Sequence, residues 1–251
     1  FVMMYLSILL SALLFMAESN ETARVSLLAL HNKVAAGEST WIAVEIEPKE
    51  GWHTYWANPG DAGLATTVEW NLPKGISLVD TVWQVPEIIQ TDEIISYGYH
   101  HKHYIFYKFT VPDNLENQIF EITGVVKWLA CKEKCLPGKD TVKIQLISSN
   151  RSEINRSFSD ILGNIPVRLD NPLRGEIKDN MLEVKLSGSL NLSEKARIIP
   201  YLEGIIDNSA AQSMQGSSLV ARLDAFHVEI PKEFKALIVD NEKAYDVVIF
   251  L

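Results

Sequence analysis

Short runs of alternating apolar and polar residues constrain the fold of this chain more than any other sequence feature. Residues 40–47 (TWIAVEIE) and 104–111 (YIFYKFTV) alternate in this way, are rich in β-branched and aromatic side chains, and end at turn-forming residues. Because short strands at such spacing are typical of antiparallel sandwiches, the sequence predicts an all-β protein, an antiparallel β-sandwich followed by a second, smaller β-rich lobe. Further runs that we interpret as strands are 119–126, 141–147, 181–187, 196–202, 218–223, 226–230, 234–239 and 244–250.

The amino-terminal residues have the pattern of a secretory leader. Residues 1–17 carry no charge and would be about 25 Å long as a helix, which is shorter than the roughly 30 Å hydrocarbon core of a membrane. Small residues at Ala17 and Ser19 flank Glu18 and resemble a cleavage site. We therefore predict a signal peptide over residues 1–19, cleaved near Ser19, and an exported mature chain.

One segment between the predicted lobes has helical rather than strand periodicity. Ser152 can cap a helix, and the apolar residues Ile154, Phe158, Ile161 and Leu162 follow at helical intervals. The sequence thus predicts a first domain over residues 20–150, a short helical linker over 151–163, and a second β-rich domain over 164–251.

Composition excludes several classes of protein. Among 251 residues, 47% are hydrophobic, which is ample for a packed core and argues against disorder. The formal net charge of −9 argues against nucleic-acid binding, which needs a basic surface. Two cysteines are too few for a disulfide-dense scaffold or a four-thiolate zinc site.

The two cysteines, Cys131 and Cys135, are the most informative residues for function. They lie between two predicted strands, one ending near Ala130 and one starting near Thr141, so both are expected at the turn of a β-hairpin. Residues 127–139 contain four lysines and one glutamate, and positive charge favours the reactive thiolate. We expect Pro137 and Gly138 to bend the chain away and leave the sulfurs accessible. The spacing alone leaves a structural staple, a redox pair and a metal site open.

Three histidines close together in the sequence bear on the metal alternative. Imidazoles of His100, His101 and His103 together with the two thiolates would suit Cu(I) or Zn. If this segment is a strand, however, His101 and His103 share one face and His100 lies on the other. The pattern is therefore also typical of surface histidines at the start of a strand.

Aromatic residues are concentrated in the first predicted domain, and all six tryptophans precede residue 129. Most are expected in the core, because each buries a large apolar area. Residues 51–63 (GWHTYWANPGDAG) are unusual because they mix large rings with turn-forming residues. Such a segment either packs over one end of the sandwich or forms part of a binding surface.

These motifs, in this order, resemble one known family. Residues 51–56 (GWHTYW), 59–63 (PGDAG), 97–99 (YGY) and 128–138 (WLACKEKCLPG) are similar to the periplasmic amino-terminal domain of the thiol:disulfide interchange protein DsbD. The likeness is closer to the ScsB branch of that family, which is associated with suppression of copper sensitivity. The resemblance implies an immunoglobulin-like fold, a periplasmic location, and a cysteine pair that carries reducing equivalents.

The resemblance also implies partners and site residues. Cys131 and Cys135 would be the catalytic pair of a thiol–disulfide oxidoreductase of the protein-disulfide reductase type, with Cys135 as the attacking residue and no cofactor. Electrons would come from a membrane-embedded donor domain by way of thioredoxin-like proteins, and oxidised periplasmic proteins would accept them. The residues expected to cap and shape the site are Ser96, Tyr97, Gly98, Tyr99, Trp128 and Pro137.

Two other functions remain open from the sequence. One is a copper-binding module without redox catalysis, which would use the cysteine pair with His100, His101 and His103. The other is a stapled sandwich without thiol chemistry.

Overall fold

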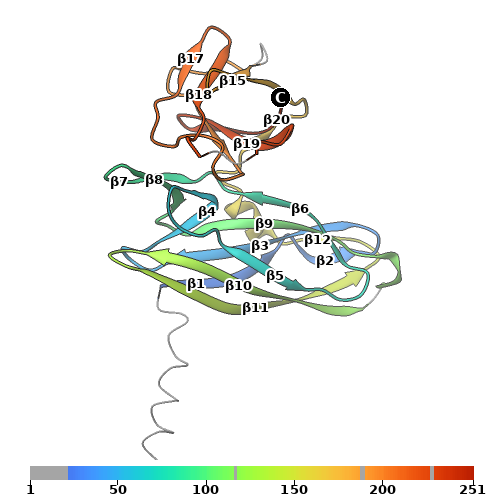
Figure 1. Ribbon diagram of the computed structural model, residues 1–251. Helices are drawn as coiled ribbons and strands as arrows, with labels where there is room; N and C mark the ends of the chain where they lie inside the picture. Colours follow the sequence, from blue (N-terminus) through green and yellow to red (C-terminus); the bar gives the residue numbers. More distant parts are fainter. Residues whose placement is uncertain (1–21, 116–117, 187–189, 227–228) are drawn as a thin grey trace, which may run out of the picture. The chain divides into compact units, whose positions relative to one another are not determined.

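The computed structural model describes residues 22–115, 118–186, 190–226 and 229–251, and strands make up most of them (Figure 1). The prediction of an all-β protein is therefore confirmed. The chain divides into two compact units. Unit 1 contains the described residues up to Thr54 together with 66–81 and 99–161, and unit 2 contains 55–65, 82–98 and the chain from residue 162 onward.

The first sheet of the sandwich forms where the sequence alternates most clearly. In β3, the side chains of Ile42, Val44 and Ile46 are fully buried, while the intervening Glu45 and Glu47 are not, as expected for a strand with one face on the core. The order of strands in this sheet is β1 (Ala23–Ala29), β3 (Ser39–Pro48), β9 (His103–Thr110) and β6 (Ser77–Trp83).

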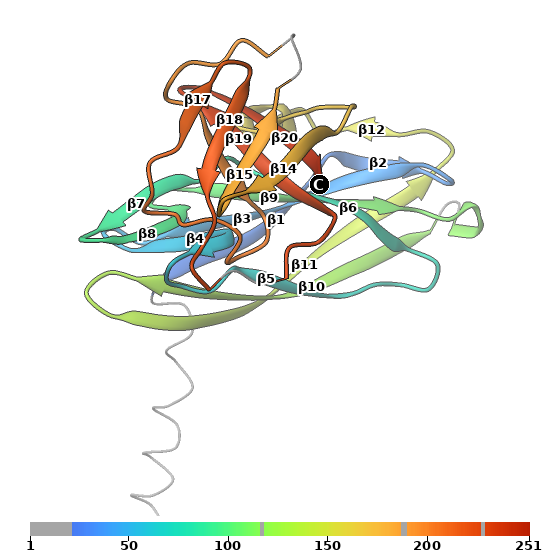
Figure 2. The same cartoon turned by 45° about the horizontal axis from the view of Figure 1, so that its top comes forward.

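The second sheet is built around a long antiparallel hairpin of β10 (Ile119–Cys131) and β11 (Cys135–Ser149), which Figure 2 shows in yellow-green. The hairpin runs from the pair Ile119–Ile147 to the pair Cys131–Cys135. The strand order is β12 (Glu153–Ile154), β2 (His31–Ala35), β11, β10, β4 (His53–Gly60), β8 (Ile94–Tyr99) and β7 (Glu87–Thr91), and β5 (Thr67–Asn71) also pairs with β10.

The core of unit 1 lies between these two sheets. The Trp70 ring of β5 contacts the rings of Tyr107 and Phe109 in β9, with 5.1 Å between centroids in both cases. Fully buried side chains come from both sheets, among them Ile105 and Ile122. Unit 1 is therefore a β-sandwich, as predicted.

Unit 2 has a mixed sheet with its own core. Its strands in order are β16 (Arg197–Pro200), β19 (Glu233–Asp240), β20 (Lys243–Phe250), β14 (Leu173–Lys178), β15 (Met181–Lys185), β18 (Ser218–Arg222) and β17 (Ser213–Gln215), with β13 (Val167–Arg168) beside β20. Buried aliphatic side chains such as Leu182, Ile198 and Leu219 form one cluster. The two-residue turn of Asp179 and Asn180 has positive φ at both residues, which suits a tight hairpin.

Several local predictions can be compared with the described residues. The expected strand at 226–230 is wrong for its described part, because residue 226 lies in a turn, 229–230 lie outside strands, and 227–228 are not described. Within 151–163 the structure has the short strand β12 followed by a 3₁₀ helix, η3 (Arg156–Ile161), with Phe158 buried. Another 3₁₀ turn, η2, covers Asp113–Leu115.

Two further expectations are not tested by the described residues. The predicted signal peptide, 1–19, lies outside them. The domain boundaries 20–150 and 164–251 stay a prediction, while residues 55–65 and 82–98 belong to the same compact unit as the second lobe. Among the described residues, no helix is both long enough and apolar enough to cross a membrane.

Candidate redox site

The two cysteines form the last rung of the β10–β11 hairpin. Cys131 and Cys135 are directly paired across the two strands, joined by a disulfide, with their Cα atoms 4.1 Å apart. Lys132, Glu133 and Lys134 make the connection, in which the Lys132 amide donates to the Lys134 carbonyl oxygen at 3.1 Å. The disulfide therefore closes the tip of the hairpin and no more distant part of the chain.

The residues that follow Cys135 continue the strand, so the expectation that Pro137 and Gly138 bend the chain away is wrong. Pro137 pairs with Leu129, and Gly138 pairs with Trp128. Proline fits here because β2 pairs with β11 only at 147–149, which leaves this part of β11 at the sheet edge.

Gly138 has a packing role opposite Trp128. A Cβ atom at Gly138 would lie 2.2 Å from Cε2 of Trp128, so only glycine lets the indole lie against the β11 backbone. The ring is buried, and its Nε1 donates to Thr22 Oγ1 at 3.0 Å. Trp128 thus shapes the hairpin from its inner face, three pairs from the disulfide.

The two cysteines differ in exposure. Cys131 is only 4% exposed, whereas Cys135 is exposed to solvent. Side chains alternate along β10, so Cys131 shares a face with Leu129 and Lys127, and Trp128 lies on the other face. One sulfur-bearing residue is therefore open to an incoming protein, and the other is held within the sheet.

Cys131 has a second cross-strand neighbour, His53, at the start of β4. The half-buried His53 ring contacts the ring of His100, with 5.3 Å between centroids. His100 is exposed in the turn between β8 and β9, so His100 and His101 lie in a turn rather than in the strand considered above. A hollow of about 590 Å³ lies beside them, lined by Glu47, Pro48, Glu50, Gly51, Trp52, His100, His101 and Lys102.

His103 occupies a different environment from the two exposed histidines. It is 2% exposed, and its ring stacks on Tyr99 with 3.8 Å between centroids. Nδ1 lies 3.0 Å from the carbonyl oxygen of His101, and Nε2 lies 3.4 Å from Thr54 Oγ1. Because a carbonyl oxygen can only accept, Nδ1 carries the proton and Nε2 accepts from the Thr54 hydroxyl. Burial lowers the pKa of His103 to about 4, although the His101 carbonyl opposes this.

The hydrogen bond between His103 and Thr54 links the two sheets close to the cysteine pair. His103 belongs to the first sheet and Thr54 to the second, where Thr54 pairs with Ala130, the residue before Cys131. Thr54 and Ala130 are both fully buried. The neutral imidazole of His103 therefore anchors the start of β4, where His53 pairs with Cys131.

The fold does not gather His100, His101 and His103, the histidines considered above as metal ligands, around the two cysteines. His103 is committed to Tyr99, Thr54 and the His101 backbone, while His100 contacts His53. Within the described ranges, no group of three or more His, Cys, Asp or Glu side chains is arranged to hold a metal ion.

Of the four expected cap residues, only Tyr99 lies in unit 1 with the cysteines. Ser96, Tyr97 and Gly98 lie in β8 within unit 2, where Ser96 Oγ donates to the Ala62 carbonyl oxygen at 3.1 Å. The buried Tyr97 hydroxyl donates to Asn208 Oδ1 at 3.0 Å, and burial raises its pKa. A shielding role for these residues stays a prediction.

The lysines near the cysteines fall into two groups. Lys127 forms an ion pair with Glu69. The hydrogen bond and charge of Lys127, with the charge of Lys139, hold the pKa of Glu69 below its usual range. Lys132 and Lys134 lie in the turn itself, and the ammonium of Lys132 lies against Gly51, where a Cβ atom would come within 2.7 Å of Nζ. The positive charge nearest the disulfide therefore comes from the turn.

Sequence reasoning missed His53 and Thr54 as parts of this site. Both lie in residues 51–56 (GWHTYW), which were interpreted as packing or binding surface and as one motif of the family resemblance, with no role for either residue. Their relation to Cys131 depends on strand register between β4 and β10, a pairing of residues far apart in the chain. The sequence feature that could have pointed to His53 is the presence of one histidine among the aromatic residues of this motif.

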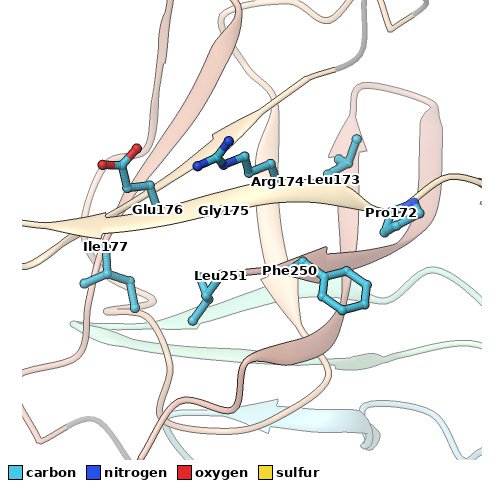
Figure 3. A pocket seen from close by; sticks show the side chains of 8 residues that line it. All are labelled: Pro172, Leu173, Arg174, Gly175, Glu176, Ile177, Phe250 and Leu251. Carbon is cyan, nitrogen blue, oxygen red and sulfur yellow. The ribbon is translucent and has the colours of Figure 1, made fainter.

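Unit 2 contains a separate hollow of about 650 Å³ between β14 and the end of β20 (Figure 3). Figure 3 shows the side chains of Arg174 and Glu176 on one side of β14 and those of Phe250 and Leu251 beneath it. The other lining residues are Pro172, Leu173, Gly175 and Ile177. Since this lining contains no thiol or imidazole, it offers nothing for thiol chemistry.

Comparisons with known proteins show which family the sandwich matches and which solved structure it resembles. Residues 24–146, which include both cysteines, match the family model described as thiol:disulfide interchange protein DsbD, N-terminal. The N-terminal periplasmic domain of ScsB from Proteus mirabilis is similar in structure, with a TM-score of 0.64 and 16% identity over 94% of this chain and 96% of that one. At this identity the likeness shows the fold.

A second solved structure is more distant. The N-terminal domain of Neisseria meningitidis DsbD in its reduced form has a TM-score of 0.34 and 14% identity, over 54% of this chain and 92% of that chain. No curated protein matches the sequence at a significant level.

Proposed function

Because residues 24–146 belong to the family of the N-terminal domain of the thiol:disulfide interchange protein DsbD, we propose that this protein is a periplasmic thiol–disulfide oxidoreductase module. It passes reducing equivalents through Cys131 and Cys135 to oxidised protein partners. The observation that carries this proposal is the disulfide at the hairpin tip, with one cysteine exposed and the other buried.

The difference in exposure supports separate roles for the two cysteines. In the reduced protein, the thiolate of the exposed Cys135 attacks a partner disulfide and displaces one partner sulfur as a thiolate. The Cys131 sulfur then attacks Cys135 and releases the second partner sulfur. Two electrons pass to the partner, whose disulfide becomes two thiols, and Cys131 and Cys135 become a disulfide.

Charge and access at the turn support Cys135 as the attacking residue. Lys132 and Lys134 flank the tip, and positive charge favours the thiolate over the thiol. A partner must place its sulfur within bonding distance of the attacking atom, and only Cys135 is exposed enough to allow this.

A purely structural role for the disulfide is less well supported. Closing a loop this short stabilises a folded domain by only on the order of 2 kcal/mol in the chain-entropy model. The same hairpin already pairs continuously from Ile119 to Cys131 and packs on a large core. A staple at its tip adds little to the fold.

Trapping of covalent complexes tests the proposed function. The Cys131→Ala protein, expressed in the periplasm and also mixed with a purified oxidised thioredoxin-like protein, should form a mixed disulfide that appears on non-reducing gels. The matched Cys135→Ala protein should trap at least about tenfold less, because Cys131 is buried. Absence of a trapped complex with either variant would contradict the proposal.

A further inference from the structure

His53 stands next to the buried sulfur of the redox pair. Cys131 in β10 is paired with Cys135 on one side and with His53 of β4 on the other. Side chains that are directly opposed across strands lie on the same face, with Cβ atoms about 4.5–5.5 Å apart. The imidazole of His53 is therefore a cross-strand neighbour of the Cys131 side chain, on the face opposite Trp128.

The proposed reaction creates a need at Cys131 that the exposed cysteine does not share. Cys135 can exchange protons with water, but Cys131 is 4% exposed. Burial disfavours a charged thiolate, so Cys131 needs a group that accepts its proton when it attacks. Imidazole is the side chain best suited to accept and return a proton near neutral pH.

Titratable groups lie around His53 on several neighbouring elements. Its ring contacts His100 in the turn after β8, where Lys102 is paired with Glu45 and Glu47. The Lys132 ammonium of the hairpin turn lies against Gly51, two residues before His53.

Further titratable groups lie on the inner side of β4 and along the hollow beside it. On the inner side, Thr54 hydrogen-bonds the neutral ring of His103 in β9. Glu50 and His101 line the hollow with Trp52 and His100. His53 is thus the imidazole that pairs directly with a reacting cysteine.

We propose that His53 is the base for the resolving step of thiol–disulfide exchange, an inference that rests on the function proposed above. As the Cys131 sulfur attacks the Cys135 sulfur of the mixed disulfide, the S–H bond of Cys131 breaks and its proton passes to His53. The bond between Cys135 and the partner breaks, and its electron pair leaves on the partner sulfur. That thiolate takes a proton from the imidazolium or from water, so charge and atoms balance.

A two-step colorimetric reaction separates this role from a general effect on the site. Dithiobis(nitrobenzoate) releases one coloured thiolate when Cys135 attacks and a second when Cys131 resolves the mixed disulfide. In His53→Gln protein at pH 7, the first release should stay within about twofold of wild type, and the second should slow at least about tenfold. The matched control is His31→Gln, which alters a histidine of β2 that is hydrogen-bonded to Thr40 of β3, and it should behave as wild type.

The pH profile adds a readout that a structural defect would not imitate. The difference between His53→Gln and wild type should shrink as the pH rises far enough for Cys131 to lose its proton to solvent. An unchanged second release in His53→Gln overturns the role of His53, while the absence of both releases in wild type overturns the proposed function. In Cys131→Ala protein, only the first release can occur, and adding His53→Gln should not change its rate. A slower first release in the double variant Cys131→Ala/His53→Gln also overturns the inference.

If His53→Gln does not fold, the wild-type protein still gives an answer. The imidazole resonances of His53, followed by NMR, should titrate at a different pH in the reduced and oxidised proteins, because the neighbouring sulfur changes from thiol to disulfide. Identical titration in both forms overturns the inference.

Discussion

His103 stays neutral inside unit 1 because its two nitrogens are fully used by uncharged partners. The His101 carbonyl accepts from Nδ1, the Thr54 hydroxyl lies near Nε2, and Tyr99 covers one face of the ring. A second proton would have to sit on a buried nitrogen that already accepts a hydrogen bond. The cost of that charge is the reason for the lowered pKa.

We predict that His103 makes the protein less stable in acid. In the unfolded chain a histidine takes up its proton near pH 6.5, whereas folded His103 does so only near about 4. The unfolded state therefore binds the proton more readily, so this contribution to stability is complete above pH 6.5 and is lost as the pH falls toward 4. The loss should be on the order of 3 kcal/mol.

Urea unfolding of wild type and His103→Gln at several pH values between 7 and 4 measures this effect. The variant should be less stable at pH 7 but should lack the part of the pH dependence that His103 contributes. Parallel profiles for the two proteins would show that the ring is not held neutral by the fold.

Gly138 gives a second prediction at the scale of one residue. Gly138→Ala places a Cβ atom 2.2 Å from Cε2 of the buried Trp128 ring, so the unfolding free energy should fall by about 1–3 kcal/mol. Gly163→Ala is the matched control, because a Cβ there meets nothing within 4 Å, and its effect should stay within about 0.5 kcal/mol. Equal effects in urea unfolding would refute the packing argument.

At the scale of the element, the β10–β11 hairpin holds the site through pairing and packing that do not involve the disulfide. The cross-strand pairing continues to the cysteines. Three pairs before the tip, the Trp128 ring packs against Gly138 and donates to Thr22. The hairpin therefore positions the two sulfurs, which the proposed function requires to separate and rejoin.

We predict that reducing the disulfide leaves unit 1 folded. The unfolding free energy should fall by no more than about 2 kcal/mol, because the closed loop is short. Far-UV circular dichroism and urea unfolding, each with and without dithiothreitol, measure this. Loss of the strand signal on reduction would instead assign the disulfide a structural role.

The hairpin also illustrates what the sequence can predict. Alternation predicts strands on both sides of the cysteines, and both cysteines were expected within the turn that joins these strands. Pro137 and Gly138 misled the prediction, because both residues are common in turns, yet one lies at a sheet edge and the other accommodates an indole ring. Local composition does not reveal either circumstance, since both depend on residues distant in sequence.

The contribution of His53 was not predictable for the same physical reason. Cys131 and Cys135 are close in sequence, so their pairing follows from one turn. The pairing of His53 with Cys131 depends on the register of β4 against β10, which the whole sandwich determines. By contrast, the family could be identified from motifs alone, because residues 51–63 and 128–138 keep their residue types and order.

At the scale of the whole molecule, unit 2 takes its residues from three stretches of chain. The buried Asn58 side chain donates to the Pro200 carbonyl oxygen at 2.8 Å and accepts from the Gly60 amide. The rings of Trp56 and Tyr201 lie 4.6 Å apart. The turn-forming part of the aromatic motif is therefore held by the second lobe, which gives residues 162–251 a structural role.

We predict that a chain ending at Ile161 keeps the strands of unit 1 but loses order in residues 55–65 and 82–98. Without Pro200, Tyr201 and Asn208, Asn58 and Tyr97 each lose a hydrogen bond, and Trp56 loses its ring contact. Hydrogen exchange should become fast in both segments and stay slow in β3 and β10. Unchanged protection of 82–98 would contradict this assignment.

The proposed function requires above all that the Cys131–Cys135 disulfide opens and closes under biological conditions. Equilibration of the protein in glutathione buffers of graded potential, with thiols counted by alkylation and mass spectrometry, measures this directly. We predict a reduction potential above about −300 mV, within reach of protein redox partners. A disulfide that stays fully oxidised down to about −300 mV would instead be a structural staple and would contradict the proposed function.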